Sequence, residues 1–526
     1  MKERKGNNSS YESKREKKQN SSYELREAEE RSRKKTQRKR LSRKARKRLR
    51  KQEYLREKKK RAVNKEFASV TYAFVCLFLL LMGYIGYFTA MTSQEIIKSP
   101  YNPRLDSMAD RVIRGKILDR NGSVLAETDH AEDGSEYRYY PYRDIFAHVV
   151  GYSVQGKSGL ESTANFELLT SNAFILEKLR REFQDQKNIG DNVVTTLDVD
   201  LQTTAYNALG DNKGAVIVME PSTGKILAMV SKPSYDPNSV IENWDWLNSD
   251  PDSILLNRAS QGMYAPGSTF KIVTTLEYMR EHPEDYGTYG YECTGEISYG
   301  DTTIPCAGHS VHGVEDLAGS FANSCNASFC NIGMNLNIVK YRNTAKDLLI
   351  GSKLPGDFAV GKSSFRLDPN DSIADKMMTA MGQGETQVSP YQMALITAAI
   401  ANGGYLMKPY LIDSVTNYKG TIVSETTPEE YTELMTLAEA SQLKAYMAEV
   451  VNYGTASVLS GQAYSAAGKT GTAEYSMESS DQTHSWFVGF TNIDNPELVI
   501  SVIVEESNGG RRAVDVAKEV FDSYYY

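Results

Sequence analysis

The pattern of apolar and polar positions divides the chain into regions of different character. Residues 67–94 contain no charged residue and include the run VTYAFVCLFLLLMGYIGYF. This run predicts one uncleaved membrane-spanning helix, because about 20 apolar residues suffice to cross a bilayer. The next hundred residues are polar and broken by Pro and Gly, which predicts a small module of short strands. From about Leu197, longer apolar runs alternate with helical patterns and predict a larger domain.

Several elements can be placed from local pattern alone. Asn121-Gly122 lies between two apolar runs in GKILDRNGSVLAET and predicts a hairpin turn. DVDLQTTAYNALG predicts a helix. KGAVIVMEPSTGKILAMVSKP then reads as two strands joined by the turn residues 221–224, so it predicts a second hairpin.

Charge separates the N-terminal region from the rest. Residues 1–66 carry 28 Lys and Arg against 10 Asp and Glu, whereas the remaining chain has a net charge of −24. The basic side of a membrane helix tends to stay in the cytoplasm, so we expect a cytoplasmic N-terminus and an extracytoplasmic region after about Met91. A cleavable signal peptide fits less well, since its apolar segment is only about 7–15 residues long. The basic tail is too polar to fold alone, and no aromatic or fold signature points to nucleic acid.

These observations predict four parts. They are a disordered basic cytoplasmic tail, a transmembrane helix, a membrane-proximal pedestal module and a catalytic domain. We place their bounds at residues 1–66, 67–91, 92–190 and 191–526.

The segment GYSVQGKS, residues 151–158, matches the phosphate-binding pattern G-x-x-x-x-G-K-[ST], and AHVV before it has the composition of a strand. Its expected position outside the cell argues against nucleotide binding. The next apolar runs also form a hairpin, whereas a P-loop needs a parallel crossover. We therefore expect a glycine-punctuated loop that joins AHVV to a short helix.

Candidate chemistry lies in QGMYAPGSTFKIVTTLEYMR. A helical pattern begins directly after Ser268, where a serine is usually an N-cap. Lys271 does not fit that interpretation, because a capping box has Glu or Gln three residues after the cap. A cation near the positive end of a helix dipole is also destabilised. Lys271 is therefore a candidate free amine, one turn from a hydroxyl whose proton it could accept.

Two further motifs follow in order. Ser324-Cys325-Asn326 stands at an apparent helix start, and Lys469-Thr470-Gly471-Thr472 opens a strand-like run. S-x-x-K with S-D-N and K-T-G is the signature of penicillin-binding proteins and class A β-lactamases. From about Tyr101 onward the chain resembles a class B penicillin-binding protein, also in RGKILDRNGSVLA and AMGQGETQVSPYQ. Cys325 replaces the Asp of S-D-N.

The resemblance implies an α+β fold, with a five-stranded antiparallel sheet flanked by helices and the site beside the sheet edge. It implies a peptidoglycan D,D-transpeptidase in which Ser268 forms an acyl-enzyme with a stem peptide and Lys271 is its base. Ser324 and Lys469 would relay protons, and Asn326 would hold the substrate amide.

The third motif would bind substrate. Thr470 and Thr472 would receive the substrate carboxylate, with Gly471 between them. The backbone N–H groups of Ser268 and Thr472 would form the oxyanion hole.

Proteins with other functions share some of these motifs and are alternatives to a transpeptidase. A D,D-carboxypeptidase would use water as acceptor. A membrane-anchored β-lactamase is disfavoured because GSKLPGDFAVGKSSFRLDPND holds no Glu to activate water. A membrane-anchored β-lactam sensor stays open as a further alternative. A bifunctional polymerase lacks room before the catalytic domain. A non-catalytic scaffold conflicts with the intact motifs.

No cofactor and no metal site are expected, because the six His show no metal-ligand spacing. Cys293 and Cys306 bracket an extracytoplasmic loop, so a disulfide between them stays open as a possibility. Cys325 and Cys330 would lie on different faces of one helix, which argues against a disulfide there.

The expected partners follow from the architecture. They are peptidoglycan stem peptides, β-lactams that acylate and inhibit the enzyme, and the membrane. By resemblance to the family, a SEDS-family glycan polymerase would contact the transmembrane helix and the pedestal module.

Overall fold

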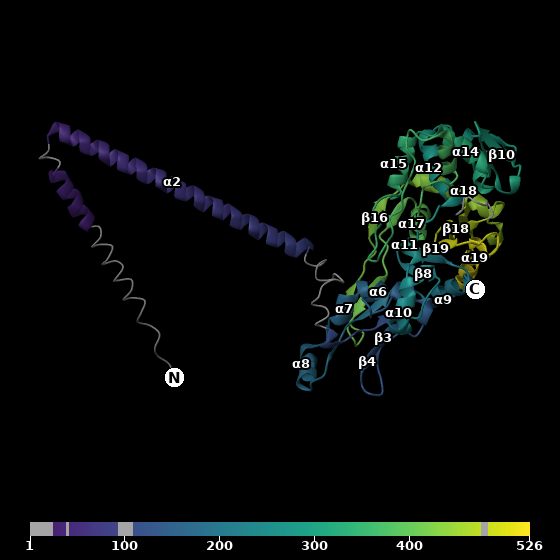
Figure 1. The fold of residues 1–526 in the computed structure, drawn as a ribbon, viewed down its shortest axis with the longest axis horizontal. Coiled ribbons are helices and arrows are strands. Elements are labelled where there is room, and N and C mark those ends of the chain that lie inside the picture. The colour runs from purple at the N-terminus through teal and green to yellow at the C-terminus, as the bar shows by residue number, and fades with distance from the viewer. Residues whose placement is uncertain (1–24, 38–41, 93–108, 475–481) are drawn as a thin grey trace. The chain divides into compact units, whose positions relative to one another are not determined.

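The computed structural model describes residues 25–37, 42–92, 109–474 and 482–526. It divides into two compact units, Met1–Gln94 and Glu95–Tyr526. The uncharged run predicted to cross the membrane lies in the first unit, and the three motifs lie in the second (Figure 1).

The first unit is dominated by the helix α2 (Arg43–Tyr87), which ends in a π-helical turn, η1 (Phe88–Thr92). Among the described residues it is the one helix long and apolar enough to cross a membrane. It begins at Arg43, and residues 25–37 are also helical, which differs from the disordered tail predicted from composition. Arg, Lys, Glu and Ala are strong helix formers. Extending an existing apolar helix also avoids the cost of nucleation.

The region predicted as the pedestal contributes β2, β3 and β4 to a six-stranded sheet of order β15-β14-β6-β2-β3-β4. The antiparallel pairing of β2 with β3 confirms the hairpin predicted around Asn121-Gly122. Two strands of this sheet come from far along the chain, β14 (Ile412–Thr416) and β15 (Ile422–Glu425). The other elements are β1 (Val112–Ile113), β2 (Ile117–Leu118), β3 (Val124–His130), β4 (Glu136–Tyr139), η2 (Arg143–Ile145), α5 (Ala147–Val150), α6 (Gly159–Thr163), α7 (Asn165–Leu169), α8 (Ile175–Phe183), β5 (Asn188–Ile189) and β6 (Asn192–Thr195).

The P-loop-like segment lies between two short helices. AHVV forms α5, so its comparison with a strand was wrong, and the expected loop leading to a short helix, α6, is confirmed. On α6, Glu161 is fully buried and its carboxylate pairs with Arg114 at 2.5 Å and Arg138 at 2.6 Å. Burial opposes ionisation, but the two guanidinium groups hold the pKa of the Glu161 carboxyl below its usual value. Through Glu161, the helix after the loop is therefore linked to the segment that precedes β2 and to β4.

The larger sheet is five-stranded and antiparallel, of order β17-β18-β19-β7-β8, which confirms the predicted fold. The β7–β8 pair is the hairpin predicted around residues 221–224. Helices α9 and α19 pack together on one face, and α11 and α17 on the other (Figure 1). The strands are β7 (Gly214–Met219), β8 (Ile226–Lys232), β17 (Ala466–Glu474), β18 (Thr483–Thr491) and β19 (Val499–Val504).

The remaining elements surround this sheet. The predicted helix DVDLQTTAYNALG is confirmed as α9 (Val199–Ala208). The others are η3 (Pro237–Ser239), α10 (Val240–Ser249), α11 (Arg258–Gln261), η4 (Gly267–Phe270), α12 (Lys271–Glu281), η5 (Tyr286–Thr288), β9 (Tyr291–Cys293), β10 (Glu296–Tyr299), β11 (Thr302–Pro305), η6 (Ala307–His309), β12 (Gly313–Glu315), α13 (Leu317–Ala322), α14 (Asn326–Asn335), α15 (Ile338–Asp347), α16 (Ile373–Ala380), α17 (Pro390–Ala401), β13 (Tyr405–Met407), β16 (Glu430–Glu433), α18 (Leu437–Asn452), η7 (Ser457–Leu459) and α19 (Ala513–Tyr525).

Candidate active site

Ser268 lies in the 3-10 turn η4, which runs directly into α12. The N-cap of α12 is Phe270, so the ordinary capping role considered for Ser268 is wrong. Its side chain is half-buried. The preceding Gly267 has a φ of 52°, and a Cβ there would lie 2.4 Å from the carbonyl oxygen of Thr472. Only glycine lets the serine turn approach β17 this closely.

Lys271 is the first residue of α12 and is completely buried. Its Nζ lies 3.0 Å from Ser268 Oγ, the contact expected from the S-x-x-K spacing. It also lies 2.7 Å from the carbonyl oxygen of Ser324, 3.2 Å from Ser324 Oγ and 2.8 Å from Asn326 Oδ1. The structure therefore brings together Ser268, Lys271, Ser324 and Asn326.

This arrangement suits a neutral amine. Burial lowers the pKa of Lys271 from 10.5 to about 8. The carbonyl oxygen of Ser324 and Asn326 Oδ1 can only accept, so they use the two N–H groups of a neutral amine. The lone pair then remains for the hydroxyl proton of Ser268. The geometry supplies a serine nucleophile with an adjacent base.

The Ser324-Cys325-Asn326 motif forms the turn between α13 and α14. The N–H of Cys325 donates to the Ser320 carbonyl at 2.9 Å, and the N–H of Ser324 donates to the Phe321 carbonyl at 3.2 Å. These two bonds make a Schellman motif, in which the left-handed position usually holds glycine. Ser324 occupies it with a φ of 57°. The motif lies at a helix start, as its pattern indicated, with Cys325 as the N-cap of α14.

Asn326 is held from both ends of its amide. Its Nδ2 donates to the Pro305 carbonyl at 3.0 Å, which leaves Oδ1 directed at Lys271. The turn thus presents two carbonyl oxygens to the amine, one from its backbone and one from a side chain.

Lys469 lies on β17, as the strand-like pattern predicted, and is fully buried. Burial and the neighbouring Lys271 lower its pKa well below the usual value. Its Nζ donates to the Thr470 carbonyl at 3.3 Å and lies 5.5 Å from the ring centroid of Phe321. In the described part of the chain, no hydrogen bond joins it to Ser268 or Ser324. Its proton-relay role stays a prediction.

Thr470, Gly471 and Thr472 form the edge of the sheet beside the serine turn. The Thr472 carbonyl faces Gly267 in the serine turn. Because the N–H and the carbonyl of one strand residue point to the same side of the strand, the Thr472 N–H also faces the serine turn. Thr470 Oγ1 lies 2.5 Å from Thr455 Oγ1, a partner that no motif or spacing indicated. A cavity of 290 Å³ is lined by these three residues and by Arg511 and Arg512, among others, but not by Ser268 or Lys271.

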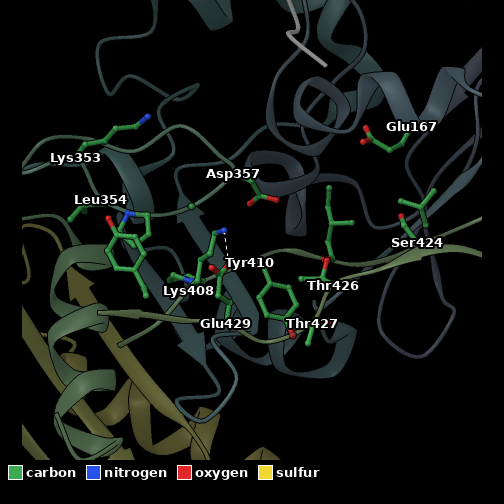
Figure 2. A pocket seen from close by; sticks show the side chains of 16 residues that line it. Glu167, Lys353, Leu354, Asp357, Lys408, Tyr410, Ser424, Thr426, Thr427 and Glu429 are labelled. Atoms are coloured by element: carbon green, nitrogen blue, oxygen red, sulfur yellow. Dashed lines mark hydrogen bonds and ion pairs between the residues drawn. The ribbon is translucent and has the colours of Figure 1, made fainter. Parts of the chain in front are cut away.

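A larger cavity, of 590 Å³, lies elsewhere in the second unit. It is lined by residues of the loop 353–357, of β14 and β15, and by Glu167 of α7 (Figure 2). Lys408 within it pairs with Glu429 at 2.9 Å. None of the predicted site residues lines this cavity.

Four further side chains form a cluster that no sequence pattern indicated. Cys293, Cys306, His312 and Cys325 come together with their Sγ and ring nitrogen atoms within 4.8 Å of one another. All four side chains are distinct from the nucleophile and its base, although Cys325 is part of the second motif. The three cysteines are free thiols, so the possible pairing of Cys293 with Cys306 is not present.

Two family models match the chain. Residues 114–193 match the penicillin binding protein A dimerisation domain, and residues 214–525 match the penicillin binding protein transpeptidase domain. The second match covers more than half of the chain.

Similar proteins and structures agree with these matches. Peptidoglycan D,D-transpeptidase PbpA of Mycolicibacterium smegmatis is 30% identical over 476 residues, 86% of this chain and 95% of that protein. The imipenem acyl-enzyme complex of M. tuberculosis penicillin-binding protein A has a TM-score of 0.71 at 28% identity, over 78% of this chain and 99% of that one. The crystal structure of a D,D-transpeptidase domain from Eggerthella lenta has a TM-score of 0.70 at 29% identity, over 79% of this chain and 98% of that one. The chain therefore belongs to the penicillin-binding protein transpeptidase family.

Proposed function

We propose that this chain is a peptidoglycan D,D-transpeptidase that works through an acyl-enzyme on Ser268. The observation that carries the proposal is the buried Lys271 amine, which lies 3.0 Å from Ser268 Oγ and contacts Ser324 and Asn326 as well. Relatives named D,D-transpeptidases and the β-lactam acyl-enzyme complexes among similar structures support it.

In the first half of the reaction, Ser268 Oγ attacks the carbonyl of the penultimate D-Ala in a stem peptide, and its proton passes to Lys271. The N–H groups of Ser268 and Thr472 stabilise the oxyanion, a contribution of about 3–4 kcal/mol for one such donor in serine acyl transfer. The tetrahedral intermediate then collapses, and the departing amine of the terminal D-Ala takes a proton from the Lys271 ammonium.

Residues of the second motif (324–326) and the third motif (469–472) orient the substrate. Thr470 and Thr472 receive the terminal carboxylate, in a cavity whose lining also includes the cationic Arg511 and Arg512. Asn326 holds the substrate amide. Ser324, whose Oγ lies 3.2 Å from Lys271 Nζ, and Lys469 relay the proton from the Lys271 ammonium to the leaving amine and shape the field at the nucleophile. The amine of a neighbouring stem peptide then attacks the acyl-enzyme ester, the bond to Ser268 Oγ breaks, and the proton of the amine returns through Lys271 to Ser268 Oγ as the crosslink closes.

The same proposal assigns a location and a partner. The apolar part of α2 crosses the membrane. The basic tail lies in the cytoplasm, because segments rich in Lys and Arg stay on the cytoplasmic side of a membrane helix. The catalytic region is extracytoplasmic. A SEDS-family glycan polymerase is the proposed partner, contacting the membrane helix and the pedestal.

The proposal is tested by labelling the full-length chain in detergent with fluorescent penicillin, wild type beside Ser268→Ala. We expect stable labelling of the wild type alone. Equal labelling of both, or labelling of neither, would contradict the acyl-enzyme, and rapid loss of label would point to a β-lactamase.

A second assay identifies the acceptor. Polymerised lipid-linked substrate carrying pentapeptide stems is incubated with the chain, and the products are separated by mass. Crosslinked dimers are the expected product. Trimmed monomeric peptides without dimers would instead identify a carboxypeptidase.

A further inference from the structure

Four potential metal ligands converge from four separate segments. Cys293 ends β9, Cys306 precedes η6, His312 precedes β12, and Cys325 is the N-cap of α14. The three thiols are buried and His312 is half-buried. Cysteine thiolates and a histidine without a carboxylate form the donor set of closed, structural zinc sites.

The distances fit one ion among the four atoms. Cys293 Sγ lies 3.6 Å from Cys306 Sγ and 3.4 Å from His312 Nδ1, and Cys306 Sγ lies 3.7 Å from Cys325 Sγ. A tetrahedral zinc with ligands at about 2.3 Å for sulfur and 2.0–2.1 Å for nitrogen sets sulfurs about 3.8 Å apart, and sulfur and nitrogen about 3.6 Å apart.

A disulfide explains the cluster less well. Its two sulfurs would lie about 2.05 Å apart, far closer than any of these pairs. One disulfide would also leave the third thiol and His312 without a role. We propose that Cys293, Cys306, His312 and Cys325 bind one zinc ion as a structural site.

This site bears directly on the second motif, because Cys325 stands between Ser324 and Asn326. Asn326 already binds the carbonyl of Pro305, the residue before Cys306. Figure 1 shows β10 beside α14, and the β10–β11 hairpin packs on that helix. Through Cys306 and Cys325, zinc would link the segment after this hairpin to the 324–326 turn. This turn presents the Ser324 carbonyl oxygen and Asn326 Oδ1 to Lys271.

The metal thus acts as a positioning group for the amine's partners and takes no part in bond making. This consequence rests on the proposed function, whereas zinc binding itself does not.

Metal content tests the site directly. We expect the full-length chain, purified in detergent without added metal, to carry one zinc per molecule. Cys293→Ala and His312→Ala are each expected to lower zinc occupancy at least about tenfold after dialysis against a weak chelator. His309→Ala is the matched control, because His309 lies in the same loop and is exposed.

Cobalt substitution adds a signature that misfolding does not produce. Cobalt(II) in the wild type is expected to show the thiolate charge-transfer and visible bands of tetrahedral coordination, lost in His312→Ala and kept in His309→Ala. No stoichiometric zinc or cobalt in the wild type, metal content that is unaffected by both substitutions, or a native disulfide within the cluster would overturn the proposal.

The positioning role is tested by removing and restoring the ion. Chelation should slow acylation by fluorescent penicillin at least about tenfold, and added zinc should restore the rate. An unchanged rate in the metal-free chain would overturn this role. Zinc bound to a chain that penicillin never labels would refute the proposed function and leave the site standing.

Discussion

At the scale of single residues, burial sets the protonation state of Lys271. Its pKa is lowered to about 8 because the folded chain removes water from the amine. Below that pH the group is an ammonium without a lone pair, and above it the group is a base. We therefore predict that acylation of Ser268 by penicillin rises about tenfold per pH unit up to about pH 8 and then levels off. A stopped-flow profile from roughly pH 6 to pH 9 checks this; a flat profile would argue against Lys271 as the base.

Ser324 occupies a left-handed position that glycine would hold without strain. Placing a side chain there costs about 1–2 kcal/mol. Ser324→Gly and Ser324→Ala both remove the hydroxyl, but only the glycine variant relieves the strain. We predict that Ser324→Gly has a free energy of unfolding about 1 kcal/mol higher than Ser324→Ala. Denaturant titrations of both variants measure the difference, and equal stability would mean that the turn is not strained as described.

At the scale of elements, the site depends on how closely the serine turn approaches the edge strand. Gly267 makes this approach possible, since a Cβ would lie 2.4 Å from the Thr472 carbonyl oxygen. Gly267→Ala is predicted to separate η4 from β17 and to slow acylation by at least about a hundredfold, because small displacements of reacting groups cost this much.

Gly287→Ala is the matched control for this change. Apart from the adjoining backbone, no heavy atom lies within 4 Å of a Cβ at that glycine, so the acylation rate of this variant should equal that of the wild type. Penicillin labelling time courses compare the variants. A Gly267→Ala variant that acylates normally would mean that the close approach is dispensable.

Elements with strong local pattern were predictable. The hairpins β2–β3 and β7–β8 and the helix α9 carry their signals in adjacent residues. The short AHVV run was wrongly likened to a strand, because four apolar residues do not distinguish a helix from a strand.

Of the site, the Ser268–Lys271 contact followed from the S-x-x-K spacing, and the other two motifs were identified by resemblance to the family. The tertiary contacts followed from neither. The left-handed Ser324 depends on hydrogen bonds to the end of α13, and the thiols of the cluster meet only after four segments fold together. Metal-binding motifs are recognised by ligands at short, fixed spacings in the sequence. The four residues of this cluster are separated by 6 to 13 positions, so metal binding was not expected from the sequence.

At the scale of the whole molecule, the chain separates into a unit with the apolar helix and a unit with the site, divided near Glu95. Each has its own internal contacts, so removing the first should leave the second folded. We predict that a chain beginning at Glu95 leaves the membrane fraction but acylates with penicillin within about twofold of the full-length rate. Cell fractionation and labelling measure both properties. Acylation that disappears on truncation would show that the site depends on the N-terminal unit.

The proposed mechanism requires Ser268 to carry the acyl group. Mass spectrometry of the penicillin-treated full-length chain after tryptic digestion tests this requirement. Cleavage after Arg258 and Lys271 releases the peptide ASQGMYAPGSTFK, which contains Ser268. We predict a single penicilloyl group in this peptide, located on Ser268 by fragmentation. An adduct on another residue, or an unmodified peptide from fully inhibited protein, would contradict it.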